Sequence, residues 1–346
     1  MKPNVVIYGH PLAHTTARFI YRAAYRDDSV GVEYVTDPKR IPAIGRDDIF
    51  LFIDPTEDWP LGLEAWPCLK AAYLIDVHMD FERRDLWASW FDVIFVAQKD
   101  YVGRLKDRGH RNVHWLPLAG DPEVHHVAGL ARHLEVGFVG RLWRRDSRRR
   151  RLLTDVLPEF RTNDYLEWSS PEDMGRIYSQ SKVVLNVSIG GDLNMRVFEA
   201  LMSGALLVTD RIDNGLDDLF VDGTHYVGYG TSEEAIAKIA HFLSHDEERQ
   251  AIADQGRRLA LAKHSYAHRW ADMRATMAGA RDHPSAVAGG CSRRALRDLY
   301  TDVFVMMRKP HRLLDVARRY GPSARIAVLL LAAFGARLKR RLGAAN

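Results

Sequence analysis

Short apolar runs alternate with longer amphipathic stretches along most of the chain, and this alternation restricts the fold more than any other feature. It is typical of βα units, in which helices cover both faces of a parallel sheet. We therefore predict an α/β fold. Strands are expected at residues 5–9, 32–35, 49–54, 73–77, 93–97, 113–118, 136–139, 183–187, 206–209 and 226–227. Helices are expected at residues 15–25, 81–90, 100–108, 147–157, 171–180, 195–203, 232–244 and 247–262.

The pattern stops and restarts once, which indicates two domains. A segment rich in proline and glycine, residues 117–122, separates the two series of strands, and the polar pair His125-His126 follows it. A chain of 346 residues also exceeds the roughly 250–300 residues at which single cores stop growing. We predict two Rossmann-like domains, residues 1–122 and 133–280, followed by a helical extension over residues 281–346 with helices at residues 293–307, 311–320 and 323–342.

The charge is divided unevenly along the chain. Residues 281–346 hold 14 Lys and Arg against 4 Asp and Glu, whereas the preceding 280 residues hold 35 against 41. The formal net charge of +4 therefore combines a mildly acidic body with a basic extension of +10. Such asymmetry indicates an anionic partner for the extension, either a membrane surface or a nucleic acid.

Several classes of protein are excluded by composition. Two cysteines are too few for a disulfide framework or a cysteine-based zinc site, so a reducing cytoplasm is expected. The N-terminus has no signal-peptide pattern, and no run approaches the ~18 uncharged apolar residues that a membrane-spanning helix needs. We expect a soluble cytoplasmic body.

The densest concentration of candidate site residues lies between residues 183 and 210. A buried strand should end at Asn186, and Gly190 and Gly191 lead into a helix that Asp192 or Asn194 would cap. The N-terminus of a helix behind glycines is suited to bind an anion, because its N–H groups and dipole are positive. Two charged residues follow on this helix, Arg196 and Glu199. Phosphate beside the arginine and hydroxyls at the glutamate would suit a nucleotide sugar, whereas the alternative is a surface ion pair between them, worth at most ~1 kcal/mol.

A second candidate lies where the second domain begins. Gly140 ends the strand at residues 136–139, and Arg141 projects from its carboxyl end, where a guanidinium matches phosphate oxygens. Seven arginines stand between residues 141 and 151. Because no series of stacking aromatics or zinc-finger spacing accompanies them, we favour a solvated helix face over nucleic-acid binding.

In the first half, polar residues follow two of the predicted strands. His14 lies in the loop after the first strand, where it either contacts a substrate or belongs to an ordinary polar loop. Asp76 and His78 leave the fourth strand together, and a histidine there can act as a base near neutral pH. The alternative is that Asp76 and Asp80 only cap the helix that begins near Phe81.

The motifs of the second half resemble those of the GT-B glycosyltransferases, in particular the group-1-like family that includes CgeB-type proteins. The resemblance runs from about Val136 to Met277. It is carried by Phe138-Val-Gly-Arg141, Leu185-Asn186, Arg196-Val-Phe-Glu-Ala200, Ser203-Gly-Ala205 and His264-Ser-Tyr-Ala-His-Arg269.

This resemblance implies a fold, an activity and roles for residues. The fold would be two Rossmann-like domains facing a cleft, with the acceptor on the side of residues 1–122 and the nucleotide sugar held by residues 133–280. Glu199 would bind the ribose hydroxyls, Arg141 and Arg196 the diphosphate, and Asn186 would lie beside the donor. The remaining donor-binding positions in the matching motifs would be Gly140, Gly190, Gly191 and Phe198.

The chain departs from the family pattern at one position. Many retaining members carry a glutamate where this chain has Gly191, which leaves the stereochemical outcome open. An inverting enzyme would use His14, Asp76 or His78 as the catalytic base, whereas a retaining one would rely on the donor phosphate. His78 falls near the active-site histidine of related enzymes. No Asp-x-Asp pair ends a strand, so we predict no metal and no cofactor.

The basic extension predicts a peripheral membrane contact. Residues 326–336 are uncharged, and the segment 323–342 has basic residues at both ends of this run, as in helices that lie at an anionic interface. The alternative is a helix packed across the two domains. We therefore expect a cytoplasmic glycosyltransferase that acts on a glycan or a lipid-linked acceptor in cell-envelope or surface polysaccharide synthesis, on the inner face of the cytoplasmic membrane. The alternatives are a catalytically degenerate GT-B scaffold that binds glycan or nucleotide, and a nucleic-acid-binding protein, the latter not favoured.

Overall fold

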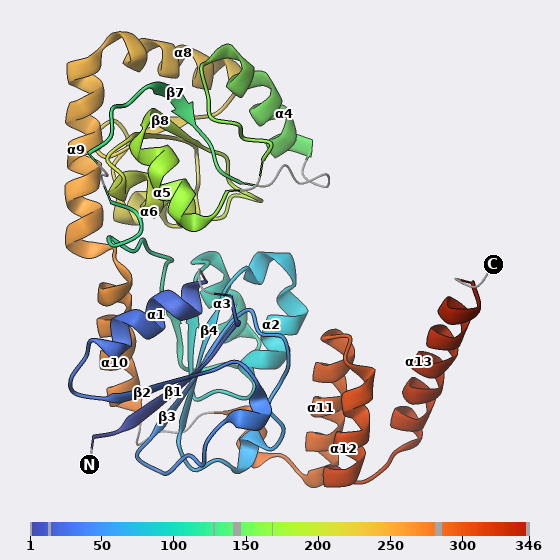
Figure 1. Cartoon of the computed structure of the whole chain (residues 1–346). Coiled ribbons are helices and arrows are strands. Elements are labelled where there is room, and N and C mark those ends of the chain that lie inside the picture. The colour runs from blue at the N-terminus through green and yellow to red at the C-terminus, as the bar shows by residue number, and fades with distance from the viewer. Residues whose placement is uncertain are drawn as a thin grey trace. The chain divides into compact units, whose positions relative to one another are not determined.

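The chain forms two compact units, each built on its own parallel sheet. The computed structural model describes residues 2–12, 15–126, 129–140, 147–167, 169–280 and 286–343. One unit contains Met1–Val96, Tyr101–His114 and Ala275–Asn346, and the other contains Ala97–Asp100 and Trp115–Arg274 (Figure 1). The predicted α/β class is confirmed.

The first unit contains a six-stranded sheet with strand order β2-β1-β3-β4-β5-β6. Its strands are β1 (Asn4–Tyr8), β2 (Gly31–Val35), β3 (Ile49–Ile53), β4 (Leu69–Leu74), β5 (Val93–Val96) and β6 (Val113–Trp115). Every residue of β3, β4 and β5 is buried, as expected for central strands covered on both faces.

The fourth strand begins earlier than predicted. Lys70 interrupts the apolar pattern, so the sequence did not reveal the first residues of this strand. The expected range was 73–77, whereas β4 runs from Leu69 to Leu74. Lys70 is only 8% exposed, and its ammonium group lies 3.4 Å from the Asp92 carboxylate. A paired lysine can therefore occupy a buried strand that its charge alone would argue against.

Three helices and three short 3-10 turns complete the first series of βα units. They are α1 (Thr16–Tyr25), η1 (Pro38–Arg40), η2 (Leu63–Ala65), η3 (Val77–Met79), α2 (Phe81–Ala88) and α3 (Asp100–Asp107). The side chain of Asp80 accepts a hydrogen bond from the Arg83 N–H at 3.3 Å and so caps α2.

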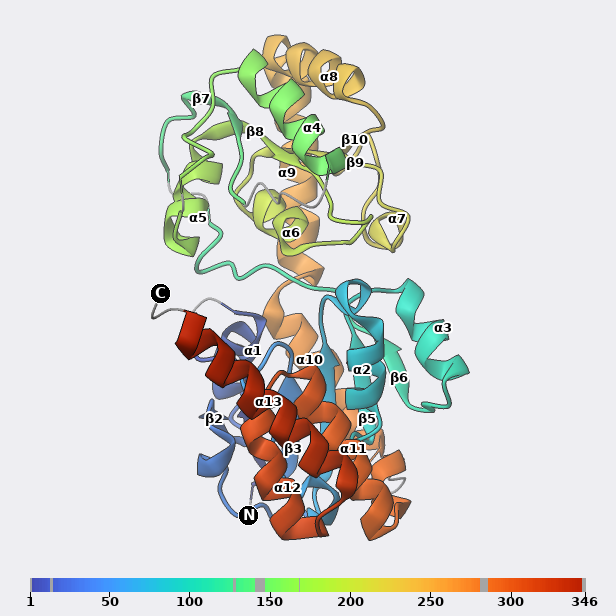
Figure 2. The same cartoon turned by 90° about the vertical axis from the view of Figure 1, so that its right-hand side faces the viewer.

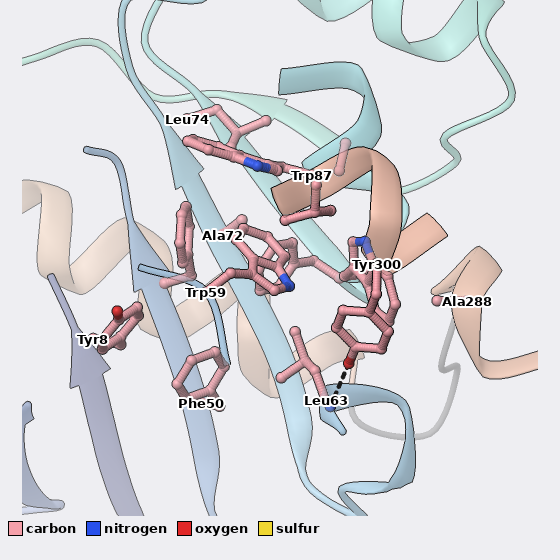
Figure 3. Packing of buried hydrophobic residues seen from close by; sticks show 14 of the residues in the cluster. Tyr8, Phe50, Trp59, Leu63, Ala72, Leu74, Trp87, Ala288 and Tyr300 are labelled. Carbon is pink, nitrogen blue, oxygen red and sulfur yellow. Dashed lines mark hydrogen bonds between the residues drawn. The ribbon is translucent and has the colours of Figure 1, made fainter. Parts of the chain in front are cut away.

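The basic extension belongs to the core of the first unit. It comprises η5 (Val287–Gly290), α11 (Arg293–Met306), η6 (Pro310–Arg312), α12 (Leu313–Tyr320) and α13 (Ala324–Gly343). Tyr300 of α11 packs against Trp90, with ring centroids 4.2 Å apart, in the same cluster as Trp59 and Trp87 (Figure 3). Its hydroxyl accepts hydrogen bonds from the N–H groups of Gly62 and Leu63, both at 2.8 Å. These helices are thus anchored by burial and by hydrogen bonds.

The second unit contains a four-stranded parallel sheet with strand order β10-β9-β8-β7. Its strands are β7 (Leu134–Gly137), β8 (Ser181–Asn186), β9 (Leu206–Asp210) and β10 (Val227–Tyr229). Its helices are α4 (Ser147–Val156), η4 (Leu157–Glu159), α5 (Pro171–Ser179), α6 (Met195–Met202), α7 (Leu216–Leu219), α8 (Ser232–Ser244) and α9 (Asp246–Lys263). Each strand lies within three residues of its predicted range because its apolar side chains fill the core of this unit.

One long helix was not predicted. Helix α10 (Tyr266–Ala280) follows α9 and continues from the second unit into the first. Its buried residues include Trp270, Met273 and Met277, a helical spacing, but His264-Ser265 before it and the polar residues between obscure that pattern. Among the described residues, no helix is long and apolar enough to cross a membrane.

Candidate functional site

The site predicted at the end of β8 is a loop whose shape depends on two glycines. Gly190 and Gly191 have φ values of 62° and 77°, a left-handed conformation that other residues rarely adopt. Asn194 occupies the N-cap position of α6, but its side chain does not bond to the helix and instead donates to Asn186 Oδ1 at 3.2 Å. The Asp192 carboxylate accepts a hydrogen bond from Gln98 Nε2 at 3.0 Å. Of the two predicted caps, Asn194 occupies the N-cap position of α6 through its backbone alone. Asp192 is not the N-cap, and its side chain holds the loop instead.

Arg196 is held firmly by its own unit. Its guanidinium donates to the Val139 carbonyl through Nε (3.1 Å) and through one terminal nitrogen (2.6 Å). The other terminal nitrogen donates to Asn186 Oδ1 at 2.9 Å, and the guanidinium carbon lies 4.8 Å from the centre of the Phe138 ring. The side chain is half-buried, and these bonds leave one N–H on each terminal nitrogen for a further acceptor.

Asn186 connects this arginine to the sheet. Its side chain is fully buried, accepts from Arg196 and donates to Thr209 Oγ1 at 2.9 Å, and its carbonyl accepts from the Tyr229 hydroxyl at 2.8 Å. Three strands therefore position Asn186, the last residue of β8, and through it Arg196 at the carboxyl end of the sheet.

Glu199 lies on the same helix but does not form a surface ion pair with Arg196. Only 6% of Glu199 is exposed, and its Oε1 lies 3.6 Å from Nε2 of His125, which is fully buried. The alternative interpretation of the sequence, a solvated Arg196–Glu199 bridge, is therefore wrong. The histidine had been assigned to a polar connecting segment, but the tertiary structure buries it inside the second unit.

Burial changes the chemistry of this carboxyl group. Desolvation raises the pKa of Glu199 to about 7, and the opposing attraction of Arg196 is the smaller effect. The Asp121 N–H donates to His125 Nδ1 at 3.0 Å, so a neutral His125 carries its proton on Nε2, the nitrogen that faces Glu199. A carboxyl group next to an N–H donor, in the second turn of α6, is suited to accept hydrogen bonds from hydroxyl groups.

Gly140 is required by the position of Arg196. A Cβ atom at residue 140 would lie 2.4 Å from a terminal nitrogen of Arg196 and 3.2 Å from one of Arg149. Glycine therefore permits the close approach of both arginines to the end of β7. The sequence had singled out this glycine as a ligand-binding position, and the structure adds a packing reason for it.

Phe198 lies in the core of the second unit. Its side chain is fully buried, with its ring centroid 5.9 Å from that of Phe220 and 6.0 Å from that of His264. The ring therefore supports α6 from inside, and it has no exposed surface for the donor contact that the motif predicted. Two other predicted residues, His14 and Arg141, lie outside the described residues.

Asp210 and Ser188 form a contact that the sequence analysis did not identify. Asp210 ends β9, is fully buried, and accepts hydrogen bonds from the Ser188 N–H (2.8 Å) and hydroxyl (2.7 Å). It also accepts from Arg148 at 3.0 Å. The sequence did contain a signal for Asp210, because it directly follows the predicted strand at residues 206–209. Asp76 was identified in the same way, as a polar residue at the carboxyl end of a strand.

The predicted catalytic residues of the first unit lie in the turn after β4. Asp76 is exposed and has a φ of 52°, and one of its carboxylate oxygens lies within 4.8 Å of a ring nitrogen of His78. Of the two suggested caps of the following helix, Asp80 caps α2, whereas Asp76 does not. Nδ1 of the half-buried His78 has no hydrogen-bond partner among the described residues.

A buried ion pair supports this turn. Asp54, at the end of β3, is 1% exposed, and its Oδ2 accepts from Arg84 Nε and from a terminal nitrogen, both at 2.9 Å. The same oxygen accepts from the Ile75 N–H at 3.2 Å, directly before Asp76. Desolvation raises the pKa of Asp54 to about 6 although Arg84 opposes it. Neither residue was predicted, because neither belongs to a recognisable motif.

Comparison with known proteins identifies the second unit. Residues 124–275 match the family model Glyco_trans_1_2, described as glycosyl transferase-like. A search of curated protein sequences finds no significant match.

Solved structures show the same fold across most of the chain. The crystal structure of Anabaena Alr3699/HepE in complex with UDP matches with a TM-score of 0.59 at 11% identity, covering 80% of this chain and 100% of that one. A glycosyltransferase from Rickettsia africae ESF-5 matches with a TM-score of 0.57 at 9% identity, covering 82% and 100%. Sucrose-phosphate synthase from Thermosynechococcus elongatus matches with a TM-score of 0.55 at 10% identity, covering 80% and 98%.

These matches define the class of the protein. The chain has the GT-B fold, and residues 124–275 match a family model described as glycosyl transferase-like. The GT-B fold expected from the resemblance to group-1-like glycosyltransferases is thereby confirmed. The CgeB-type placement within that group stays a prediction.

Proposed function

We propose that this protein transfers a sugar from a nucleotide sugar to a glycan or lipid-linked acceptor, in the synthesis of a cell-envelope or surface polysaccharide. The observation that carries the proposal is the joint placement of Asn186, Arg196 and Glu199 where β8 leads into α6. The similar fold of Alr3699/HepE, whose structures contain UDP and UDP-glucose, makes uridine nucleotides the first donors to test.

The donor diphosphate would bind at Arg196. The arginine keeps two N–H groups after its internal bonds, and the N-terminus of α6 adds positive potential. Its bonds to Val139 and Asn186 hold the guanidinium in place before a ligand arrives, which lowers the entropic cost of binding. Arg141 would supply a second cation, as the matching motif implies.

The nucleoside would be recognised at Glu199. Its buried carboxyl group can accept hydrogen bonds from two neighbouring ribose hydroxyls, and binding of such donors favours the ionised form. The Nε2–H of His125 gives the ionised carboxylate one polar neighbour inside the unit. Donor binding would thus stabilise the charge that burial disfavours.

The acceptor would be activated from the first unit. His78 has an unpartnered Nδ1 and lies beside Asp76, so it can take the proton of an acceptor hydroxyl if the reaction inverts the anomeric centre. His14 is the other candidate base. In a retaining reaction the donor phosphate would take this proton instead. Gly191 lacks the glutamate of many retaining members, and its φ of 77° would strain any side chain placed there.

No metal is proposed for this reaction. Arginine side chains and a helix N-terminus can neutralise the leaving diphosphate by electrostatics alone. Addition of EDTA should therefore leave the transfer rate unchanged, and a rate that returns only with a divalent cation would contradict the proposal.

Calorimetric titration with UDP, UDP-glucose and the GDP-, dTDP- and ADP-linked sugars tests the donor site. Arg196→Ala should reduce affinity for the preferred donor by about 100-fold, because a charge-assisted contact of ~1.5–3 kcal/mol is lost together with its positioning bonds. Arg176→Ala is the matched control, since Arg176 lies in the same unit, its side chain is 61% exposed, and it forms a surface pair with Asp173. Equal affinity in wild type and Arg196→Ala would refute the site.

A degenerate scaffold that only binds nucleotide or glycan is the second candidate. Gly191 in place of a glutamate and the burial of Glu199 in the unliganded chain favour it. Slow hydrolysis of the donor in the absence of acceptor distinguishes the two. An enzyme should release the free sugar, and loss of this release in His78→Ala would assign it to the predicted base, whereas a scaffold should release none.

A further inference from the structure

Helix α13 has two apolar faces, and only one of them is covered. Ile326 is 2% exposed, and Leu329 and Leu330 pack against the core of the first unit. On the other side, Val328, Leu331 and Phe334 are 64%, 72% and 69% exposed. Helix α13 contacts η6 and α12, in front of which it passes in Figure 2, so the covered face is the one toward these elements.

The uncovered face contains no polar side chain over three turns. Every residue from Ile326 to Ala336 is apolar, whereas the outward face of a surface helix is ordinarily polar. Three large side chains one turn apart, with alanines between them, form a continuous apolar strip along this face. A strip of this kind marks a contact surface.

The charge around the strip has one sign. Arg325, which pairs with Asp302 of α11, precedes it, and Arg337, Lys339, Arg340 and Arg341 follow it, while the chain has no acidic residue after Asp315. A second copy packed through the same face would bring two such basic helices together with no acid on either. An anionic lipid surface complements both the apolar strip and the basic ends.

We propose that α13 docks the protein on an anionic membrane surface, with Val328, Leu331 and Phe334 inserted at the boundary between headgroups and acyl chains. The uncharged run of 11 residues is ~16 Å long as a helix, about half of the hydrocarbon core. The helix therefore lies along the surface, with its other face still on the first unit. This contact depends on α13 alone and not on the transfer reaction.

Co-sedimentation of the full chain with vesicles tests the docking. The chain should bind vesicles of phosphatidylcholine mixed with phosphatidylglycerol, bind pure phosphatidylcholine far more weakly, and dissociate as salt is raised. Leu331→Glu should lower the partition coefficient at least about tenfold, because an inserted side chain is replaced by a charge that the anionic surface repels. Leu166→Glu is the matched control, since Leu166 is 71% exposed in the second unit and should leave binding unchanged.

Three results would overturn the proposal. The first is no binding to anionic vesicles, and the second is equal binding of wild type and Leu331→Glu. The third is a dimer of the wild-type chain that Leu331→Glu converts to a monomer in analytical ultracentrifugation, which would assign the strip to a second copy. Thermal melting verifies the folding of each variant. If Leu331→Glu is destabilised, Phe334→Ser carries the same comparison, because Phe334 is 69% exposed.

Discussion

Nε2 of His125 lies 3.6 Å from Oε1 of Glu199, and both side chains are buried within the second unit. This contact joins the Arg196–Ala200 motif, which carries the resemblance to GT-B glycosyltransferases, to a segment that no motif covers. The Asp121 N–H fixes the orientation of the imidazole, so the proton-bearing nitrogen faces the carboxyl group. Burial thus disfavours the ionised form of Glu199 although His125 and Arg196 lie near it, and carboxyl groups with a raised pKa are common at functional sites.

Glu199→Gln should stabilise the protein at alkaline pH. The folded-state pKa of Glu199 is about 7 against an ordinary value of 4.5, so its stabilising contribution is complete below pH 4.5 and is lost as pH rises through 7. A neutral amide avoids this loss, so the variant should exceed wild type at pH 8 by on the order of 3 kcal/mol in the free energy of unfolding. The two should converge near pH 4.5.

Urea denaturation at both pH values measures this difference. Glu159→Gln provides the control, because Glu159 is exposed in the same unit. Donor affinity should fall in Glu199→Gln even as stability rises. A variant less stable than wild type at pH 8 would show that the carboxylate is favourably bound in the unliganded protein.

Gly140→Ala should weaken donor binding without a large loss of stability. The added Cβ would lie 2.4 Å from an Arg196 nitrogen, so the guanidinium must shift from its bonds to Val139 and Asn186. We expect about a tenfold loss of nucleotide affinity by calorimetry, since ~1.4 kcal/mol corresponds to one misplaced charge-assisted bond. Gly103→Ala, with nothing within 4 Å of its Cβ, should bind as wild type does.

Arg84→Met should destabilise the first unit in a pH-dependent way. Loss of Arg84 leaves the Asp54 carboxylate, 1% exposed, without its cation, at a cost of about 3–5 kcal/mol near pH 8. Because Arg84 lowers the pKa of Asp54, its removal raises that pKa further above 6, and at pH 5 the group becomes neutral. The loss measured by urea unfolding should therefore be smaller at pH 5. Arg108→Met, which breaks an exposed bridge to Glu82, should cost at most about 1 kcal/mol at either pH.

Tyr300→Phe should loosen the basic extension from the first unit. The variant removes the acceptor for the N–H groups of Gly62 and Leu63, together with a bond of 2.8 Å to Glu64, while it keeps the ring against Trp90. Two unsatisfied buried donors should lower the free energy of unfolding by about 2–4 kcal/mol. Tyr320→Phe is the comparison, because its hydroxyl bonds only to the side chains of Glu64 (2.6 Å) and Arg319 (3.2 Å) among the described residues, and it should cost about 1 kcal/mol. Equal losses in thermal or urea melts would show that the backbone bonds contribute little.

Local pattern was sufficient to predict much of this protein. Strands such as β1, β3 and β8 follow from buried apolar runs, and their parallel order follows from the helices between them. The loop after Asn186, with Gly190 and Gly191, follows from residues whose backbone preferences are local. For the same reason the motif around Arg196 and Glu199 could be recognised without a structure.

Tertiary structure decided the partners of the charged residues. Glu199 contacts His125 rather than Arg196, Asp210 holds Ser188, and Asp54 pairs with Arg84, and none of these pairs is local in sequence. Their positions depend on which strand ends become neighbours, and their pKa values depend on burial, neither of which a linear pattern contains. The sequence by itself thus determined the fold class and the local structure of the motif that we propose binds an anion. Only the folded chain decided which charges are buried, which are paired, and that α13 is left with an uncovered apolar face.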